Sequence, residues 1–170
     1  MVALCWITMS ICGAVPFVVS GAYPNPFVAL FEIVSGFTTT GATVATDVEI
    51  LPRSILMWRS FSHWVGGMGV LVFMLAILPM GASSMYLMKA ESPGPSVGKL
   101  VPRVRSTAKI LYIIYLFLTL LQMTLMILFD CPVFDAVNLT FATAGTGGFA
   151  VLNSGCETYN TAVQIILTVF

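Results

Sequence analysis

The chain has 170 residues, of which 58% are hydrophobic and only 8% are charged, and its formal net charge is zero. Ordinary soluble domains carry roughly 25% charged residues, so this composition excludes a soluble globular fold. No basic patch with interleaved aromatic residues is present, which excludes a nucleic-acid partner. We therefore expect an all-α integral membrane protein whose surrounding partner is the lipid bilayer.

Three apolar segments approach the length of about 20 residues that a helix needs to cross a bilayer. They cover residues 1–19, 54–78 and 108–129, and a fourth begins near Tyr159 and is still apolar at Phe170. No basic region precedes the first segment and no clear cleavage pattern ends it, so a removable signal peptide is not favoured. Because the last segment stops within an expected helix, we expect the chain to be a fragment.

Two shorter apolar segments lie between these spans, at residues 26–37 and 132–143. Each has about a dozen residues, too few to cross a bilayer as a helix, which indicates a re-entrant segment. Each begins with a proline, which suits the first helical position, and Asn25 is a good N-cap before the first. A Thr/Gly-rich loop follows each of them, at residues 38–43 and 143–149. The order helix, short helix, loop and helix is therefore repeated.

Charge placement predicts the orientation of these repeats. Residues 80–107 contain four basic residues and a single acid, Glu91, so the positive-inside rule places this loop in the cytoplasm. The loop separates a first repeat at residues 1–79 from a second at residues 108–170, and both Thr/Gly loops then face outside. Acids on the outer side either raise the local cation concentration or are ordinary solvated charges. These acids are Asp47, Glu49, Asp130, Asp135 and Glu157.

A Thr/Gly loop at membrane depth indicates an ion pathway. Non-helical backbone is tolerated there only where it is buried in protein or lines a water-filled cavity. Carbonyl oxygens of an extended loop can replace the hydration shell of a cation, and glycine permits the positive φ angles that such a loop needs. The preceding short helix adds the partial negative charge of its C-terminal end. Because this chemistry uses no titratable side chain, we expect no catalytic residue, no organic cofactor and no enzyme.

Several motifs in the chain resemble those of one known family. They are Phe31-Glu32, Ser35–Thr43, Leu51-Pro52-Arg53, Trp58-Arg59, Trp64–Gly69, Ile77-Leu78-Pro79 and Thr146–Phe149. Over almost its whole length the chain is similar to the TrkH/KtrB family of potassium uptake proteins, within the superfamily that includes the plant HKT transporters. The resemblance implies a multi-pass protein of the plasma membrane, or of the inner membrane of a bacterium, that conducts a monovalent cation through a filter of backbone carbonyls.

The resemblance also implies four repeats around one pore, with one filter glycine in each; this chain covers about one and a half. Gly41 is then the filter glycine of the first repeat, and a glycine rather than a serine there resembles the potassium-selective members. For the second repeat we predict Gly147, which lies as far from Pro132 as Gly41 does from Pro26. The alternatives are Gly145 and Gly148.

The predicted site residues form two groups. Those whose backbone carbonyls are expected to bind potassium are Thr39, Thr40, Gly41, Ala42, Thr146, Gly147 and Gly148. Those expected to support the filter are Glu32, Thr38, Gly145 and Phe149. An acid at membrane depth such as Glu32 is a functional candidate by default, and we expect it to pin the filter loop by hydrogen bonds rather than touch the ion. Arg59 is expected to snorkel to the outer interface.

The family resemblance implies two protein partners, a second copy of the protein in a homodimer and a cytoplasmic nucleotide-binding regulatory subunit of the TrkA/KtrA type. It leaves open whether uptake is symport with protons or sodium or a channel-like leak, and which nucleotide regulates it.

Two other functions are weighed against cation transport. A membrane-embedded hydrolase would use Ser60 or Ser62 with His63, but these neighbouring positions do not aim at each other and no orienting acid is close in sequence. A non-conducting scaffold that associates through its glycine-rich helices would leave both Thr/Gly loops without a purpose. We expect His63 to have a structural role beside the interfacial Trp64.

Four cysteines occur without any C-x-x-C pair or nearby histidine cluster, which excludes a zinc or thioredoxin-type site. Cys131 and Cys156 flank the second Thr/Gly loop. We expect them to be small apolar residues, with a disulfide on an oxidising face as the alternative.

Overall fold

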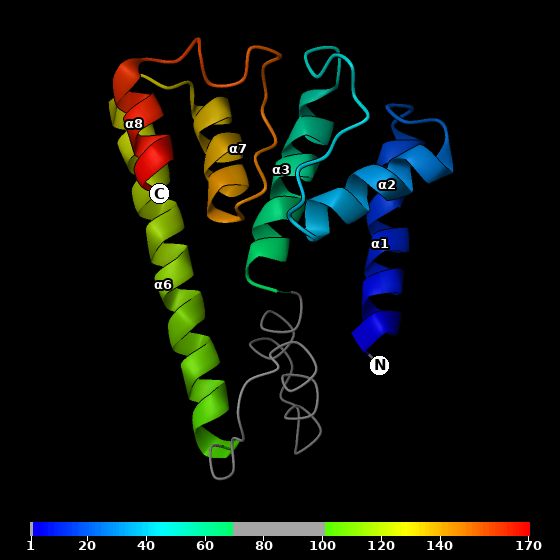
Figure 1. Ribbon diagram of the computed structural model, residues 1–170, viewed down its shortest axis with the longest axis horizontal. Helices are drawn as coiled ribbons and strands as arrows, with labels where there is room; N and C mark the ends of the chain where they lie inside the picture. Colours follow the sequence, from blue (N-terminus) through cyan, green and yellow to red (C-terminus); the bar gives the residue numbers. More distant parts are fainter. Residues whose placement is uncertain (1, 70–100) are drawn as a thin grey trace.

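The computed structural model describes residues 2–69 and 101–170. Every regular element within these ranges is a helix, as the sequence predicts. The helices are α1 (Val2–Val19), α2 (Pro26–Phe37), α3 (Arg53–Gly67), α6 (Val101–Leu128), α7 (Val133–Ala144) and α8 (Thr161–Val169). Figure 1 shows them as two sets, α1–α3 and α6–α8, which meet where α3 and α7 lie side by side. Of the predicted cytoplasmic loop, residues 80–100 lie outside the described residues and residues 101–107 belong to α6.

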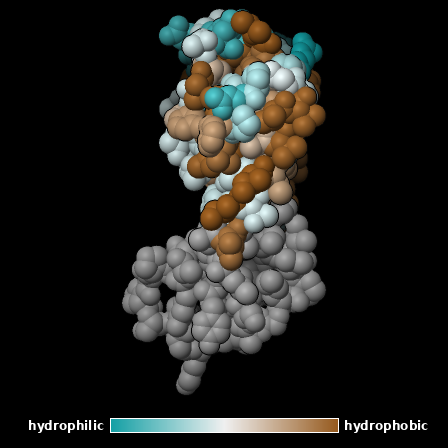
Figure 2. Space-filling view, turned by 90° about the vertical axis from the view of Figure 1, so that its right-hand side faces the viewer, coloured by the Kyte–Doolittle hydropathy of each residue, from teal (hydrophilic) through white to brown (hydrophobic). Residues whose placement is uncertain are grey.

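The surface of the described helices suits a lipid environment. The segment Ala108–Leu128 of α6 is long and apolar enough to cross a membrane, with 21 residues and a mean hydropathy of 2.2. Trp6–Val19, Pro26–Phe37 and Val133–Ala144 are shorter apolar segments. Figure 2 shows hydrophilic residues gathered at the end where the connecting loops lie, with apolar side chains covering the helices below. An apolar belt under a polar rim is the pattern that a bilayer and its aqueous boundary select.

The two short helices begin in slightly different ways. Pro26 is the first residue of α2, and the Asn25 side chain caps this helix by accepting a hydrogen bond of 3.0 Å from the Phe27 N–H. Pro132, in contrast, occupies the N-cap position, so α7 begins at Val133. The first short helix therefore has the predicted bounds, whereas the second lies one residue further along the chain than the predicted 132–143. Helix α8 begins at Thr161, after the cap formed by Asn160, rather than near Tyr159.

Helix α3 ends earlier than the predicted span 54–78. It ends at Gly67, and the N–H of Gly69 donates a hydrogen bond of 2.8 Å to the Gly66 carbonyl. Gly69 has a φ of 67°, the left-handed conformation with which glycine commonly terminates a helix. The span predicted as one continuous helix is therefore interrupted at this point, and its residues after Gly69 lie outside the described residues.

Helix α3 packs against both short helices at the points where these end. Gly66 lies directly against the carbonyl of Phe37, the last residue of α2, and a Cβ at Gly67 would lie 2.6 Å from the Cα of Gly145, which caps α7. Side chains at these two positions would collide with backbone. The pair of glycines therefore allows one helix to touch the C-terminal ends of both short helices.

Each repeat has its own apolar core. The first includes Phe17 of α1, Ile33 of α2 and Ile55 of α3. The second includes Met126 of α6, Leu139 of α7 and Val163 of α8. Ile55 and Val163 both occupy the third position of the last helix in their repeat. The two cores are therefore built from the same three elements, which is the packing expected of a repeat.

Candidate cation pathway

The two Thr/Gly loops have the same unusual backbone conformation. In the first loop, Thr39 has a φ of 54° and Gly41 a φ of 73°; in the second, Thr146 has a φ of 57° and Gly148 a φ of 80°. Glycine adopts such angles readily, but a β-branched residue does so rarely. Strained residues of this kind persist where the surrounding structure over-determines them, and they gather at functional sites. The repetition of this strain in both loops marks them as equivalent sites.

Backbone hydrogen bonds fix which residues of the two loops correspond. The N–H of Thr40 donates to the Ser35 carbonyl at 3.0 Å, and the N–H of Gly147 donates to the Ala142 carbonyl at 2.9 Å. Both bonds span five residues, so Gly147 is the counterpart of Thr40.

The counterpart of Gly41 is consequently Gly148, one of the alternatives, and not the predicted Gly147. Counting from the two prolines gave the neighbouring residue because α2 includes its proline whereas α7 begins one residue after Pro132.

The two loops lie against each other. The carbonyl oxygen of Gly147 lies so close to Gly41 that a Cβ there would overlap it. Next to this contact is an open hollow of about 310 Å³, lined by residues that include Gly41 and Thr43 of the first loop, Gly148 of the second loop, and Asn153. The predicted filter residues Thr40, Ala42, Thr146 and Gly148 are exposed, as is the support residue Thr38. The described chain therefore brings both predicted filter segments to one shared opening.

A buried ion pair between Glu32 and Arg59 fixes the end of the first loop. Glu32 is completely buried and Arg59 is 1% exposed, and the Arg59 Nε lies 2.8 Å from Glu32 Oε1. The same carboxylate accepts hydrogen bonds from the Thr43 hydroxyl at 2.7 Å and from the Val44 N–H at 3.1 Å. The Arg59 Nη2 also donates to the Thr43 hydroxyl at 2.9 Å. Glu32 thus accepts hydrogen bonds from the end of the first loop, as predicted.

Arg59 does not snorkel outward as predicted, because its guanidinium is enclosed between the two loops. Besides Glu32, it faces the ring of Phe149 at 4.2 Å from the ring centroid, a cation–π contact. Phe149 stacks in turn on His63 at a centroid distance of 4.0 Å. Sequence reasoning missed this role of Arg59, although a buried acid such as Glu32 requires a counter-charge and the next helix supplies one.

Asn153 links the two segments that follow the Thr/Gly loops. Its side-chain oxygen accepts a hydrogen bond of 2.9 Å from the Val48 N–H, and its amide nitrogen donates to an Asp47 carboxylate oxygen at 2.7 Å. Its backbone N–H donates to the Glu49 carboxylate at 3.0 Å. The Asn153 hydrogen bond and that from the Glu49 N–H lower the pKa of Asp47 below its ordinary value of 3.8. We call this set of bonds the Asn153 latch.

The Asn153 latch is expected to be sensitive to acid. Because the folded state lowers the Asp47 pKa, its stabilising contribution is complete above the unfolded value of about 4 and is lost as the pH falls through the lower folded value. Hydrogen-exchange mass spectrometry of the intact protein should show protected amides at residues 48 and 153 at pH 7 and weaker protection, after correction for intrinsic rates, near pH 3.

Asn153→Ala removes the acceptor of the Val48 N–H and should abolish the protection of the residue 48 amide at both pH values, whereas Ser154→Ala, which leaves the latch intact, should retain it. Equal protection in the Asn153→Ala variant and the unaltered protein would contradict the latch.

The geometry gives no support to a serine hydrolase. The Ser62 hydroxyl donates to the Arg59 carbonyl at 2.6 Å, and neither ring nitrogen of His63 has a hydrogen-bond partner among the described residues.

Cys131 and Cys156 are free thiols, so the alternative of a disulfide between them is not realised.

Two short helices end beside α3, and each continues into a strained Thr/Gly loop at one shared hollow, which is the arrangement expected of a pore-loop membrane protein. The family model of the TrkH cation transport proteins matches residues 1–170. The chain therefore belongs to the TrkH family, a family of transporters and not of enzymes.

The chain is similar to several curated members of this family. It is 39% identical to the Trk system potassium uptake protein TrkH of Salmonella typhimurium, over 99% of this chain and 37% of that protein. It is 38% identical to TrkH of Halomonas elongata over 99% of this chain and 36% of that protein. The crystal structure of the potassium transporter TrkH from Vibrio parahaemolyticus matches with a TM-score of 0.76 and 34% identity, over 99% of this chain and 34% of that one. The chain thus spans little more than a third of the length of these relatives.

Proposed function

We propose that this chain supplies two of the pore loops of a potassium uptake transporter in the plasma membrane, or in the inner membrane if the source is a bacterium. The observation that carries the proposal is the repeated conformation of residues 39–41 and 146–148 at one opening. The names of the curated relatives, which are potassium uptake proteins, support the choice of ion. The pore loops face outside in this proposal, and the predicted loop 80–107 faces the cytoplasm.

The proposed filter binds potassium through backbone carbonyls of residues 39–42 and 146–148, with Gly41 and Gly148 as the two filter glycines. None of these residues has a titratable side chain, so the ligands are carbonyl dipoles that replace the hydration shell of the ion. Potassium is the cargo, and this mechanism requires no organic cofactor.

A further repeat is needed to surround the ion path, and the first repeat offers a place for it. Helix α3 of the first repeat packs against α6 and α7 of the second repeat. Its Trp64 ring lies 5.6 Å from the Tyr115 ring of α6 and 5.5 Å from the Phe141 ring of α7. The corresponding groove between α1 and α2 is open, with a volume of about 360 Å³.

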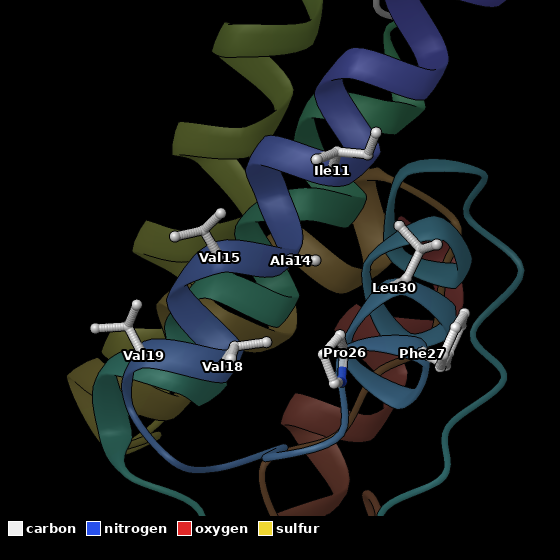
Figure 3. A pocket seen from close by; sticks show the side chains of 8 residues that line it. All are labelled: Ile11, Ala14, Val15, Val18, Val19, Pro26, Phe27 and Leu30. Atoms are coloured by element: carbon white, nitrogen blue, oxygen red, sulfur yellow. The ribbon is translucent and has the colours of Figure 1, made fainter.

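Figure 3 shows the apolar side chains that line this groove, and Phe27 at its rim is 81% exposed. We propose that an inner helix of another repeat occupies this groove, as α3 occupies the matching one.

Two partners belong to the proposal. Membership of the TrkH family supports a homodimer and a cytoplasmic nucleotide-binding subunit of the TrkA/KtrA type. Both are testable on the intact protein by mass measurement in detergent with and without the co-expressed subunit.

Two glycines in the second repeat allow a matched test of the proposed filter. Gly148 and Gly155 both have positive φ, at 80° and 64°, and a Cβ at either would meet nothing within 4 Å. Alanine at either position therefore costs similar backbone strain, about 1–2 kcal/mol. In cells that lack their own potassium uptake, Gly148→Ala in the intact protein should lower the preference for rubidium over sodium about tenfold.

Gly155→Ala should leave that preference unchanged, since Gly155 lines the hollow but is not one of the proposed carbonyl ligands. Equal ratios in the two variants would contradict the filter assignment.

A further inference from the structure

His63 is a buried polar residue that carbonyl-based conduction leaves unused. It lies on α3, one helical turn after Arg59, and is completely buried. Both ring nitrogens lack a hydrogen-bond partner among the described residues. Burying a polar group without a partner costs free energy, so an unpartnered group of this kind requires an explanation.

The surroundings of the imidazole ring supply that explanation. A Cβ at Gly147 would overlap the Nδ1, Cγ and Cε1 atoms of His63, so one edge of the ring lies directly behind Gly147. A Cβ at Gly145 would overlap the His63 backbone carbonyl. The Phe149 ring lies 4.0 Å from the imidazole, with an angle of 27° between the two planes. His63 thus touches alternate residues of the second loop.

These contacts restrict the peptide group of Gly147. Its N–H is held by the Ala142 carbonyl at 2.9 Å, and its carbonyl oxygen is directed at Gly41 in the first loop. With its N–H bound to α7 and the imidazole behind it, Gly147 has no space on that side into which to withdraw. Its counterpart in the first loop, Thr40, is exposed.

Helix α3 therefore holds the two loops by different means. Arg59 acts on the first loop through charge and hydrogen bonds, and His63 lies against the second through the flat face and edge of its ring.

We propose that His63 is a positioning residue for the second filter loop, and that its flat ring keeps the Gly147 carbonyl on the ion path. This role rests on the proposed function. A filter discriminates between cations through the placement and number of its carbonyls. Removal of the ring lets the loop relax toward α3, and the relaxed loop tolerates sodium better. The effect is therefore on selectivity rather than on the rate of uptake alone.

The test uses the intact protein reconstituted in lipid vesicles, with rubidium uptake measured in the presence of increasing sodium. His63→Ala should lower the selectivity for rubidium over sodium about tenfold, and His63→Leu, which fills the space without a flat surface, should do the same. His63→Gln retains a planar group that can lie on Phe149 and should stay within about twofold of the unaltered protein.

A control on the same helix separates positioning from general packing. Phe61 stacks on Trp64 and meets Phe141 edge to face, and both of these rings belong to helices rather than to the loop. Phe61→Leu should therefore change the melting temperature without changing the selectivity ratio. Unaltered selectivity in both the Ala and Leu variants of His63, or an equal loss in the Gln variant, would overturn the positioning role while leaving the proposed function standing. An intact protein without rubidium uptake would overturn the proposed function itself.

Discussion

Substitution of Gly41 by alanine or serine in the intact protein is expected to reduce its preference for potassium over sodium by about ten- to a hundredfold, or roughly 1.4–2.8 kcal/mol. Two effects act together. Gly41 has a φ of 73°, a backbone angle that residues with a side chain rarely adopt, and a Cβ added there would overlap the carbonyl oxygen of Gly147. Because that oxygen is one of the proposed ligands, the substitution displaces both loops at once. The measurement is rubidium uptake in competition with sodium in cells that lack other potassium uptake.

Gly21 is a matched control for this prediction. It has the same φ of 73° but lies in an exposed turn where a Cβ would meet nothing within 4 Å. Gly21→Ala thus imposes the same backbone strain without contact with the filter, and it should leave selectivity unchanged. A Gly41→Ala protein that is expressed normally and retains the unaltered ratio would contradict the proposed role of Gly41.

The second large effect is expected from breaking the buried ion pair. Glu32→Gln leaves the Arg59 charge enclosed without a counter-charge, which costs about 3–5 kcal/mol in buried pairs. It also weakens the hydrogen bonds that this side chain accepts from Thr43 and Val44, so selectivity should fall together with stability. Thermal unfolding of the purified intact protein, followed by fluorescence-detected chromatography, measures the first effect and rubidium–sodium competition the second.

A double-mutant cycle isolates the interaction between these two residues. Removing both charges, as in Glu32→Gln combined with Arg59→Met, should recover part of the stability lost in either single variant, because no uncompensated charge remains. Glu157→Gln removes an exposed carboxylate that makes no hydrogen bond or ion pair with the other described residues, and it is the control for loss of charge alone. If Glu32→Gln unfolds at the same temperature as the Glu157→Gln control, the ion pair is not a stabilising feature.

The sequence predicts the fold class and the alternation of long and short helices because these depend on local properties. The length of an apolar run separates a span such as Ala108–Leu128 from a short helix such as Pro26–Phe37. Proline and Asn25 mark the start of α2, and the Thr/Gly-rich loop after it marks its end. These signals act within a few residues and can be read from one sequence.

The contacts that organise the site depend instead on pairing between distant residues. Arg59 meets Glu32 across 27 positions, and Asn153 meets Asp47 across 106. Nothing in the local sequence around these residues indicates that they are in contact.

The counterpart of Gly41 is predicted at Gly147 instead of Gly148 for a different reason. Proline suits both the N-cap and the first helical position, so the sequence alone does not decide whether α7 begins at Pro132 or at Val133. That one residue decides which glycine of the second loop corresponds to Gly41. The break after Gly67 was hidden because the apolar run continues through it.

The most direct test of the proposed pathway is to locate the bound ion. Crystals of the intact protein grown with thallium, a heavy potassium analogue, should give an anomalous peak between the carbonyl oxygens of residues 39–41 and those of residues 146–148. A well-defined thallium peak on the protein's transport path, with none at these two loops, would contradict the claim that this chain supplies part of the filter.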